Sequence, residues 1–102
     1  MAYPENTVQI RSASASVSDG IFAKTAFARD LIRLRFRRLR LSQSAFADRF
    51  GLTFGLMKDQ EQARVAPSRA LRVLIAAIEL DPELIERAAR VAAERWSADV
   101  PQ

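Results

Sequence analysis

The chain lacks cysteine and histidine altogether, and these two absences exclude several kinds of site. Without cysteine there is no disulfide framework and no thiolate nucleophile, and without both residues there is no Cys/His zinc site. Without histidine, catalytic schemes that use an imidazole base are also excluded. The carboxylates are scattered among arginines in a helical pattern, which is typical of solvated helix faces. We therefore expect a protein that is not an enzyme and that uses no cofactor and no metal.

Long apolar runs are absent as well. No apolar stretch approaches the about 20 residues that a helix needs to span a bilayer. The N-terminus has no basic segment followed by an apolar one, which a secretory signal would require. We expect a cytoplasmic protein with no membrane partner, and 102 residues are a suitable length for one domain.

Proline and glycine are scarce, and no proline occurs between Pro4 and Pro67. The intervening sequence is rich in alanine, leucine and arginine, which favour helices. We predict an all-α fold with five helices. They are expected at about residues 21–39, 43–50, 54–62, 68–79 and 82–96.

The first predicted helix has a less regular pattern than the others. Ser18 or Asp19 is its expected N-cap. Its apolar stripe consists of Phe27, Leu31, Leu34 and Leu39. Residues 32–36 alternate apolar and basic side chains, which is a strand period, but the surrounding helix formers outweigh it. Phe36 lies off the stripe, so we expect it to be exposed and available to a partner.

The other helices are marked by local start and stop signals. Ser42 and Thr53 are N-cap residues, and Gly51 stands where a helix end needs a left-handed residue. Asp81 is expected to cap the last helix, with Pro82 in its first turn.

Residues 41–67 contain the pattern that suggests a function. A cap, a short helix, a three-residue turn, a second cap and a second short helix follow one another, which is the helix-turn-helix arrangement. In this arrangement the first helix supports the second, which enters a major groove of DNA. Ala47 is expected where the two helices approach most closely. Phe46, Leu52 and Met57 would close the core between them.

At these residues the sequence resembles the Cro/C1-type (Xre) helix-turn-helix family, and within it the HigA-like antitoxins. The residues that match the family pattern in register are Leu41, Ser42, Gln43, Phe46, Ala47, Gly51, Thr53, Glu61 and Pro67. The segment RALRVLIAAIELDPELIERAA that follows resembles the antitoxin branch. The resemblance covers about residues 31–92. It implies a five-helix lambda-repressor-like domain that binds double-stranded operator DNA as an autorepressor and, in the antitoxin branch, also binds a toxin protein.

The sequence departs from the family pattern at Gln60, where the family has an aromatic residue, and at Ala63, where it has glycine. By family register the groove-facing positions are Thr53, Phe54, Gly55, Lys58 and Asp59. Phe54 suits a thymine methyl group, and Lys58 suits guanine or a phosphate. Asp59 would repel a phosphate unless it is paired.

Phosphate contacts are expected at both ends of the helix-turn-helix. The resemblance implies that Gln43, next to the cap Ser42, reaches the DNA backbone from the start of its helix. Arg64 and Arg69 flank the second helix and could clamp phosphates. The alternative for all of these side chains is an ordinary place on the surface.

Positive charge gathers in the N-terminal half of a chain whose net charge is +4. Residues 22–40 carry seven basic side chains against one acid, whereas residues 79–99 carry six acids against three arginines. Such segregation indicates an anionic partner, most often nucleic acid. Arg37, Arg38 and Arg40 would extend the DNA contact or bind an acidic partner.

One domain of this kind covers one operator half-site, so we expect a homodimer. The last helix is the expected dimerisation element. The residues assigned to a dimer or partner contact are Phe36, Leu84, Ile85, Val91 and Trp96.

Residues 1–20 form a flexible N-terminal arm by composition, because they offer few large apolar side chains. The alternation of Val8, Ile10 and Val17 with polar residues would also suit a strand added to a partner.

Three functions stay open at this point. The first is a DNA-binding autorepressor that serves as an antitoxin. The second is a protein-interaction module with this fold and little DNA readout, which the unusual set Phe54, Gly55 and Asp59 motivates. The third is a regulator of a phage or mobile element that binds DNA without a toxin.

Overall fold

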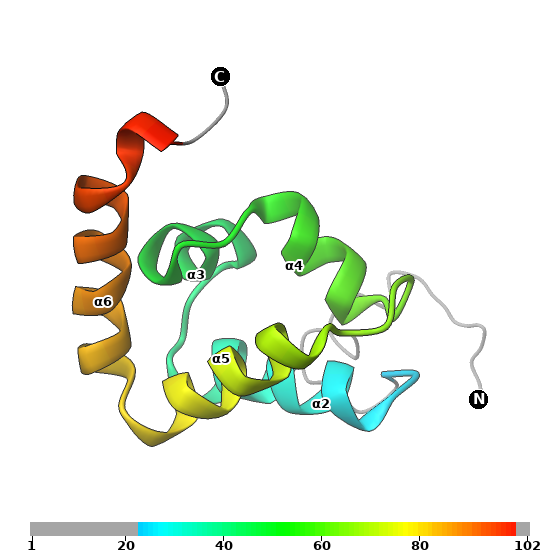
Figure 1. Cartoon of the computed structure of the whole chain (residues 1–102). Coiled ribbons are helices and arrows are strands. Elements are labelled where there is room, and N and C mark those ends of the chain that lie inside the picture. The colour runs from blue at the N-terminus through cyan, green and yellow to red at the C-terminus, as the bar shows by residue number, and fades with distance from the viewer. Residues whose placement is uncertain (1–22, 100–102) are drawn as a thin grey trace, which may run out of the picture.

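The computed structural model of the chain describes residues 23–99, so the predicted arm at residues 1–20 lies outside it. The described residues form five α-helices and no strand, which confirms the all-α prediction (Figure 1). None of these helices is both long and apolar enough to cross a membrane. The helices are α2 (Ala26–Ile32), α3 (Gln43–Phe50), α4 (Phe54–Glu61), α5 (Arg69–Leu80) and α6 (Pro82–Arg95), with a π-helix η1 (Arg33–Arg38) after α2 and a 3₁₀ turn η2 (Ser97–Asp99) after α6.

The first helix begins later than predicted. Residues 23–25 are not helical, and α2 starts at Ala26. The hydroxyl of Thr25 accepts a hydrogen bond from the backbone N–H of Ala28 at 3.1 Å, which satisfies one of the unpaired donors of the first turn. The prediction of a helix from residue 21 is therefore wrong over residues 23–25. The caps proposed for it, Ser18 and Asp19, lie outside the described residues.

The second half of this predicted helix is a π-helix. In its wide turns the N–H of Leu39 donates to the carbonyl of Leu34, and the N–H of Leu41 donates to that of Arg35, both at 3.0 Å. Leu34 and Arg35 are buried, whereas Phe36 is 43 % exposed, as predicted. The π-helix therefore turns Arg35 inward and leaves its neighbour Phe36 at the surface.

The caps predicted for the later helices are confirmed. Ser42, Thr53 and Asp81 each accept a hydrogen bond from the backbone N–H three residues on, at 3.0–3.1 Å, and Ser68 does the same for α5. Gly51 is left-handed, with φ 74°. Because these signals are local, α3 to α6 begin and end within one residue of the predicted positions.

The core lies where α2 and η1 meet α3, α4 and α5. Leu31 and Leu34 from the predicted stripe are buried, and Phe27 and Leu39 pack against the core. The rings of Phe46 and Phe50 lie 4.8 Å apart with their planes at 58°. The remaining buried core residues are Ala28, Ile32, Ala47, Met57, Leu71, Ile75 and Ile78.

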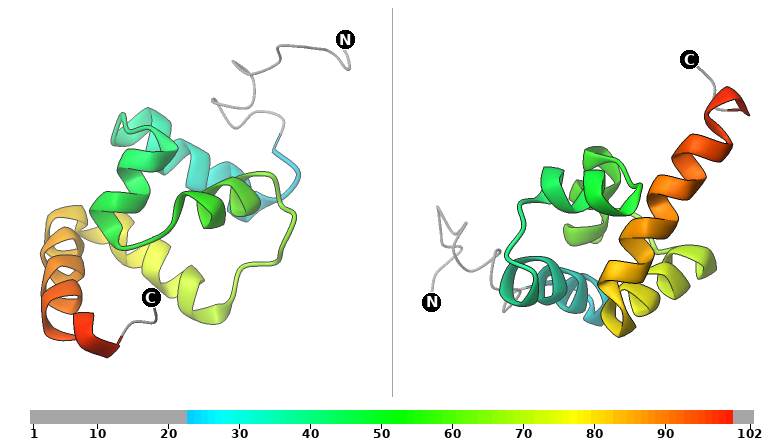
Figure 2. Two further views of the ribbon diagram at one scale, coloured as in Figure 1. Left: turned by 90° about the horizontal axis from the view of Figure 1, so that it is seen from above. Right: turned by 90° about the vertical axis from the view of Figure 1, so that its left-hand side faces the viewer.

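Helix α6 lies along one side of the molecule, against α3 and α5 (Figure 2). It has no fully buried residue, but Ile85 packs against the core. Arg49 of α3 holds it with a hydrogen bond of 2.8 Å from Nε to the Oε1 of Glu86. This hydrogen bond holds the pKa of the Glu86 carboxyl below its ordinary value.

We expect Gly51→Ala to lower the free energy of unfolding by about 1–2 kcal/mol, because a Cβ is unfavourable in the left-handed region. A methyl group there would meet the Cβ of Ala89 at 3.5 Å, an ordinary contact, so backbone strain is the only penalty. Gly55→Ala is the matched control. Its methyl group would meet no described atom within 4 Å, so stability should be unchanged or higher. Urea unfolding measures both variants, and an unchanged Gly51→Ala would contradict this role of the turn.

Candidate functional site

Helices α3 and α4 form a compact unit joined by the three residues Gly51, Leu52 and Thr53. The two helices lie at an angle to each other (Figure 1). Phe46, Ala47 and Met57 are buried between or beneath them, as predicted, and Leu52 packs against the same cluster. The unit thus has a packed inner side, and its outer side belongs mainly to α4.

The outer side of α4 carries most of the predicted groove-facing residues. Thr53, Phe54, Gly55 and Lys58 are exposed, although the Thr53 hydroxyl also caps the helix. The ammonium group of Lys58 lies 5.3 Å from the centre of the Phe54 ring, a cation–π contact. Asp59 is half-buried and pairs with Arg64 at 3.3 Å. The structure therefore brings these residues onto one surface and gives Asp59 a partner.

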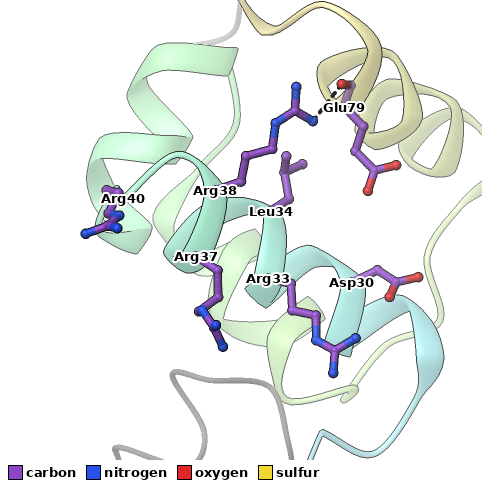
Figure 3. A pocket seen from close by; sticks show the side chains of 7 residues that line it. All are labelled: Asp30, Arg33, Leu34, Arg37, Arg38, Arg40 and Glu79. Carbon is purple, nitrogen blue, oxygen red and sulfur yellow. Dashed lines mark hydrogen bonds between the residues drawn. The ribbon is translucent and has the colours of Figure 1, made fainter.

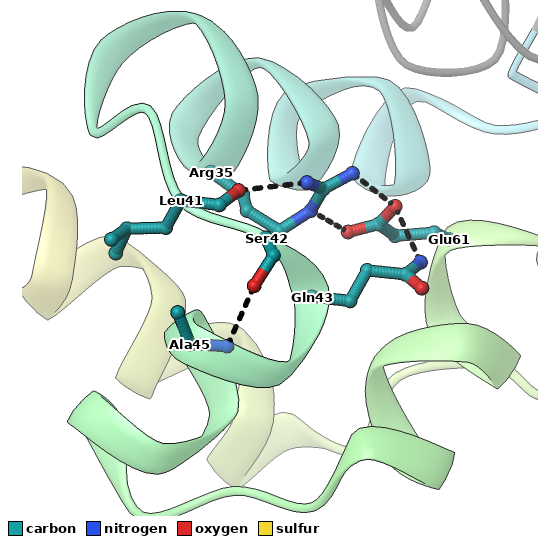
Figure 4. Close-up of polar contacts among 6 residues, drawn as sticks. All are labelled: Arg35, Leu41, Ser42, Gln43, Ala45 and Glu61. Atoms are coloured by element: carbon teal, nitrogen blue, oxygen red, sulfur yellow. Dashed lines mark hydrogen bonds and ion pairs between the residues drawn. The ribbon is translucent and has the colours of Figure 1, made fainter.

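The inner end of α4 is held by a buried ion pair (Figure 4). Arg35 is 7 % exposed and Glu61 is 4 % exposed. The Nε of Arg35 donates to one carboxylate oxygen of Glu61 at 2.6 Å, and its Nη2 donates to the other at 2.9 Å. Its Nη1 donates to the carbonyl of Leu41 at 2.9 Å. This two-pronged, charge-assisted geometry is the strong form of an Arg–carboxylate contact.

Gln43 belongs to the same network. Its Nε2 donates to the Oε1 of Glu61 at 3.0 Å, and the residue is half-buried. One of the two N–H donors of its side-chain amide is therefore used by Glu61, and the contact of Gln43 with a DNA backbone stays a prediction. The adjacent Ser42 is exposed, and its hydroxyl caps α3 by accepting from the N–H of Ala45.

Arg64 and Arg69 lie on either side of the loop that leaves α4. Both are exposed, and Arg69 is the first residue of α5. Arg64 shares its charge with Asp59. The structure thus places both arginines at the surface beyond the end of α4, where the sequence predicted them.

The residues assigned to a dimer or partner contact do not all share a surface. Leu84, Val91 and Trp96 are about half exposed along α6, and Phe36 is exposed on η1. Ile85 is partly buried and packs against the core, and its assignment to an intermolecular contact stays a prediction. The helical turn separates Ile85 from the outward positions of α6.

Sequence reasoning missed the role of Arg35, which it counted only among the basic residues of segment 22–40. It also left Glu61 as a family match with no structural role. The sequence carries no clear signal for the pair, because Arg35 is one of five arginines within residues 33–40 and Glu61 lies 26 residues further on. Gln60, a departure from the family pattern, is buried, and its Oε1 has no hydrogen-bond partner among the described residues.

No family model, no curated protein and no solved structure matches this chain.

We expect Arg35→Met to lower the free energy of unfolding by about 3–5 kcal/mol, because it leaves the carboxylate of Glu61 buried without its counter-ion. The double variant Arg35→Met/Glu61→Leu removes both charges and should regain at least half of that loss. Equilibrium urea unfolding of the two single variants and the double variant measures the coupling. A loss below about 1 kcal/mol in Arg35→Met would show that the pair does not hold α4.

Proposed function

We propose that this protein is a DNA-binding transcriptional regulator, an autorepressor, in which α3 and α4 act as a helix-turn-helix of the lambda-repressor-like type. The observation that carries the proposal is that α4 is held at one end and exposed on its outer side. One end of the helix is held by the buried pair of Arg35 and Glu61. On the outer side of the helix, Phe54, Gly55 and Lys58 are all exposed.

The chemistry of this exposed side suits a major groove, which is wide enough for an α-helix. Lys58 would donate to guanine or to a phosphate, and Phe54 would contact a thymine methyl group. Gly55 has open space around it, so the backbone of α4 can approach a base edge closely. Lys58 would exchange its contact with the Phe54 ring for the DNA contact.

The charges around α4 suit the sugar-phosphate backbone. Arg64 neutralises Asp59, which removes the repulsion that an unpaired carboxylate would exert on a phosphate. Arg69 adds a second exposed cation beyond the end of α4. At the other end of the unit, the hydroxyl of Ser42 and the second N–H of the Gln43 amide remain as donors near the start of α3.

A homodimer fits this proposal, because one α4 reads one half-site. The exposed residues Leu84, Val91 and Trp96 on α6 supply an apolar surface for a second copy. A two-fold contact through this helix would use the same residues on both subunits.

The antitoxin role and the regulator without a toxin are two forms of the same proposal, and they differ only in the partner. The resemblance to HigA-like antitoxins supports the first. Co-purification with the product of an adjacent open reading frame separates them, because only an antitoxin should form a stable complex with that protein.

A protein-interaction module with little DNA readout is the second candidate function. Phe54 favours it, since this aromatic side chain is half exposed on the outer side of α4. Arginine, lysine, asparagine and glutamine are the usual base readers, and α4 exposes only Lys58 from this group among its groove-facing positions.

The DNA proposal is tested by fluorescence anisotropy with a duplex from the gene's own promoter. Binding should weaken steeply with salt, because released counterions drive it. Lys58→Ala should weaken binding by about 1–3 kcal/mol, the range for one lost base contact. Gln43→Ala should also weaken binding, since it removes the side-chain amide that is expected to donate to the DNA backbone. Arg87→Ala on α6 is the control, because it removes one positive charge, as Lys58→Ala does, outside the assigned surface. Equal affinity for wild type, Lys58→Ala and Gln43→Ala would contradict the assigned surface.

The dimer is tested by sedimentation of Leu84→Glu/Val91→Glu, which places two charges in the expected apolar contact. We expect a monomer, because an unpaired charge in an apolar interface is strongly unfavourable. Val73→Glu, a matched change at an exposed position of α5, should leave the dimer intact. A wild-type protein that sediments as a monomer at micromolar concentration would overturn this part of the proposal.

A further inference from the structure

Exposed arginines line the outward side of η1 and the short link from η1 to α3. We call Arg33, Arg37 and Arg40 the arginine edge; all three are exposed. Two open clefts of about 680 and 640 Å³ lie along it, and Arg37 and Arg40 line both. The first cleft is completed by Asp30, Arg33, Leu34, Arg38 and Glu79 (Figure 3), and the second by Arg35, Phe36, Leu41 and Ser42.

The two clefts differ in charge. The first contains the carboxylates of Asp30 and Glu79, and Arg38 is tied down there by a 2.7 Å hydrogen bond from its Nη1 to the carbonyl of Glu79. No carboxylate from residues 23–99 lines the second. Its Arg35 is neutralised by Glu61, and the exposed Arg40 adds a positive charge to it. An anion is therefore favoured in the second cleft.

The backbone that presents Arg40 is strained and rigid. Arg40 is left-handed, with φ 59°, a conformation that glycine adopts without a Cβ penalty. Leu41, the next residue, makes two hydrogen bonds with Arg35. Its N–H donates to the Arg35 carbonyl, and its own carbonyl accepts from the Arg35 guanidinium. Strain of this kind concentrates at functional sites. A long cation at such a position points to a role for its side chain outside the fold.

The place of the second cleft indicates which anion it meets. Ser42, which lines it, is the N-cap of α3, and the next residue, Gln43, contacts Glu61 at the end of α4. The cleft therefore borders the surface that the proposed function assigns to DNA. A duplex whose major groove holds α4 carries its backbone phosphates beside that groove, within reach of side chains at the border.

We propose that Arg40 binds a backbone phosphate of the DNA duplex in this second cleft, outside the groove that α4 enters. This inference rests on the proposed function and adds a sequence-independent contact that fixes the position of the protein along the duplex. Arg33, which lies in the cleft with Asp30 and Glu79, has no part in it.

The experiment uses the full chain and a duplex from its own promoter, titrated by anisotropy at several salt concentrations. Arg40→Gly removes the cation and gives the left-handed position the residue it favours, so the unfolding midpoint should not fall. We expect the salt slope of log K to become shallower by about 0.9 for each bound subunit, and affinity to fall about three- to tenfold near 0.1 M salt. Arg37→Gln/Arg40→Gly should reduce the slope at least as far.

Two comparisons make the outcome specific. The ratio of affinities for the promoter duplex and a scrambled duplex should be unchanged in Arg40→Gly, since a phosphate contact carries no sequence information. Arg33→Ala, the matched control on the same segment, should keep the wild-type slope. An equal change of slope in Arg33→Ala and Arg40→Gly would mean that the slope depends on the total positive charge and not on a contact in the cleft. That result would overturn the inference.

The two proposals fail in different ways. If the wild-type chain does not bind the duplex even at low salt, the proposed function itself is wrong. If the wild-type chain binds but Arg40→Gly keeps the full salt slope and affinity, only the phosphate cleft is wrong. Loss of binding to a poly-glutamate peptide in Arg40→Gly, with DNA binding unchanged, would assign the cleft to an acidic protein segment and overturn the inference.

Discussion

The buried ion pair between Arg35 and Glu61 is the interaction on which the arrangement of the helices depends. Moving two charges out of water is strongly unfavourable unless hydrogen bonds satisfy both charged groups. Here Glu61 accepts from Arg35 and Gln43, and Arg35 also donates to the carbonyl of Leu41. The network therefore joins η1, the link before α3, the first turn of α3 and the end of α4. The direction in which α4 presents its outer side follows from this junction.

The irregular backbone around η1 is a consequence of the same pair. The wide π-turns let Leu34 and Arg35 both face inward, while Phe36 and Arg37 face outward. Single π-turns within helices are frequent at functional sites, where they change the direction of a side chain. The left-handed Arg40 then returns the chain to α3. Local strain is thus located beside the surface with the proposed function, at Arg40 and at Ala63, which follows α4 with φ 55°.

The parts of the fold that are coded locally were predictable from the sequence. Ser42, Gly51 and Thr53 act within one turn of their own helix, so the bounds of α3 and α4 could be read directly. The inward turn of Arg35 could not, because it depends on Glu61, 26 residues away, and on a helix with a different period. For the same reason the sequence predicted the exposure of Lys58 correctly but missed the contact between Gln43 and Glu61. Local signals define elements, whereas paired buried charges define how the elements meet.

The separation of charge along the chain acquires a spatial meaning in the proposed complex. Basic side chains gather on η1 and around the end of α4, whereas α6 carries three acids and three arginines. A polyanion would attract the first surface, whereas α6 has no net charge, so the field would turn η1 and the end of α4 toward the polyanion before contact. In that orientation α6 would not be part of the surface that meets the DNA backbone. Its exposed apolar residues would then stay free for a second copy, so DNA binding and dimerisation would use separate surfaces and need not compete.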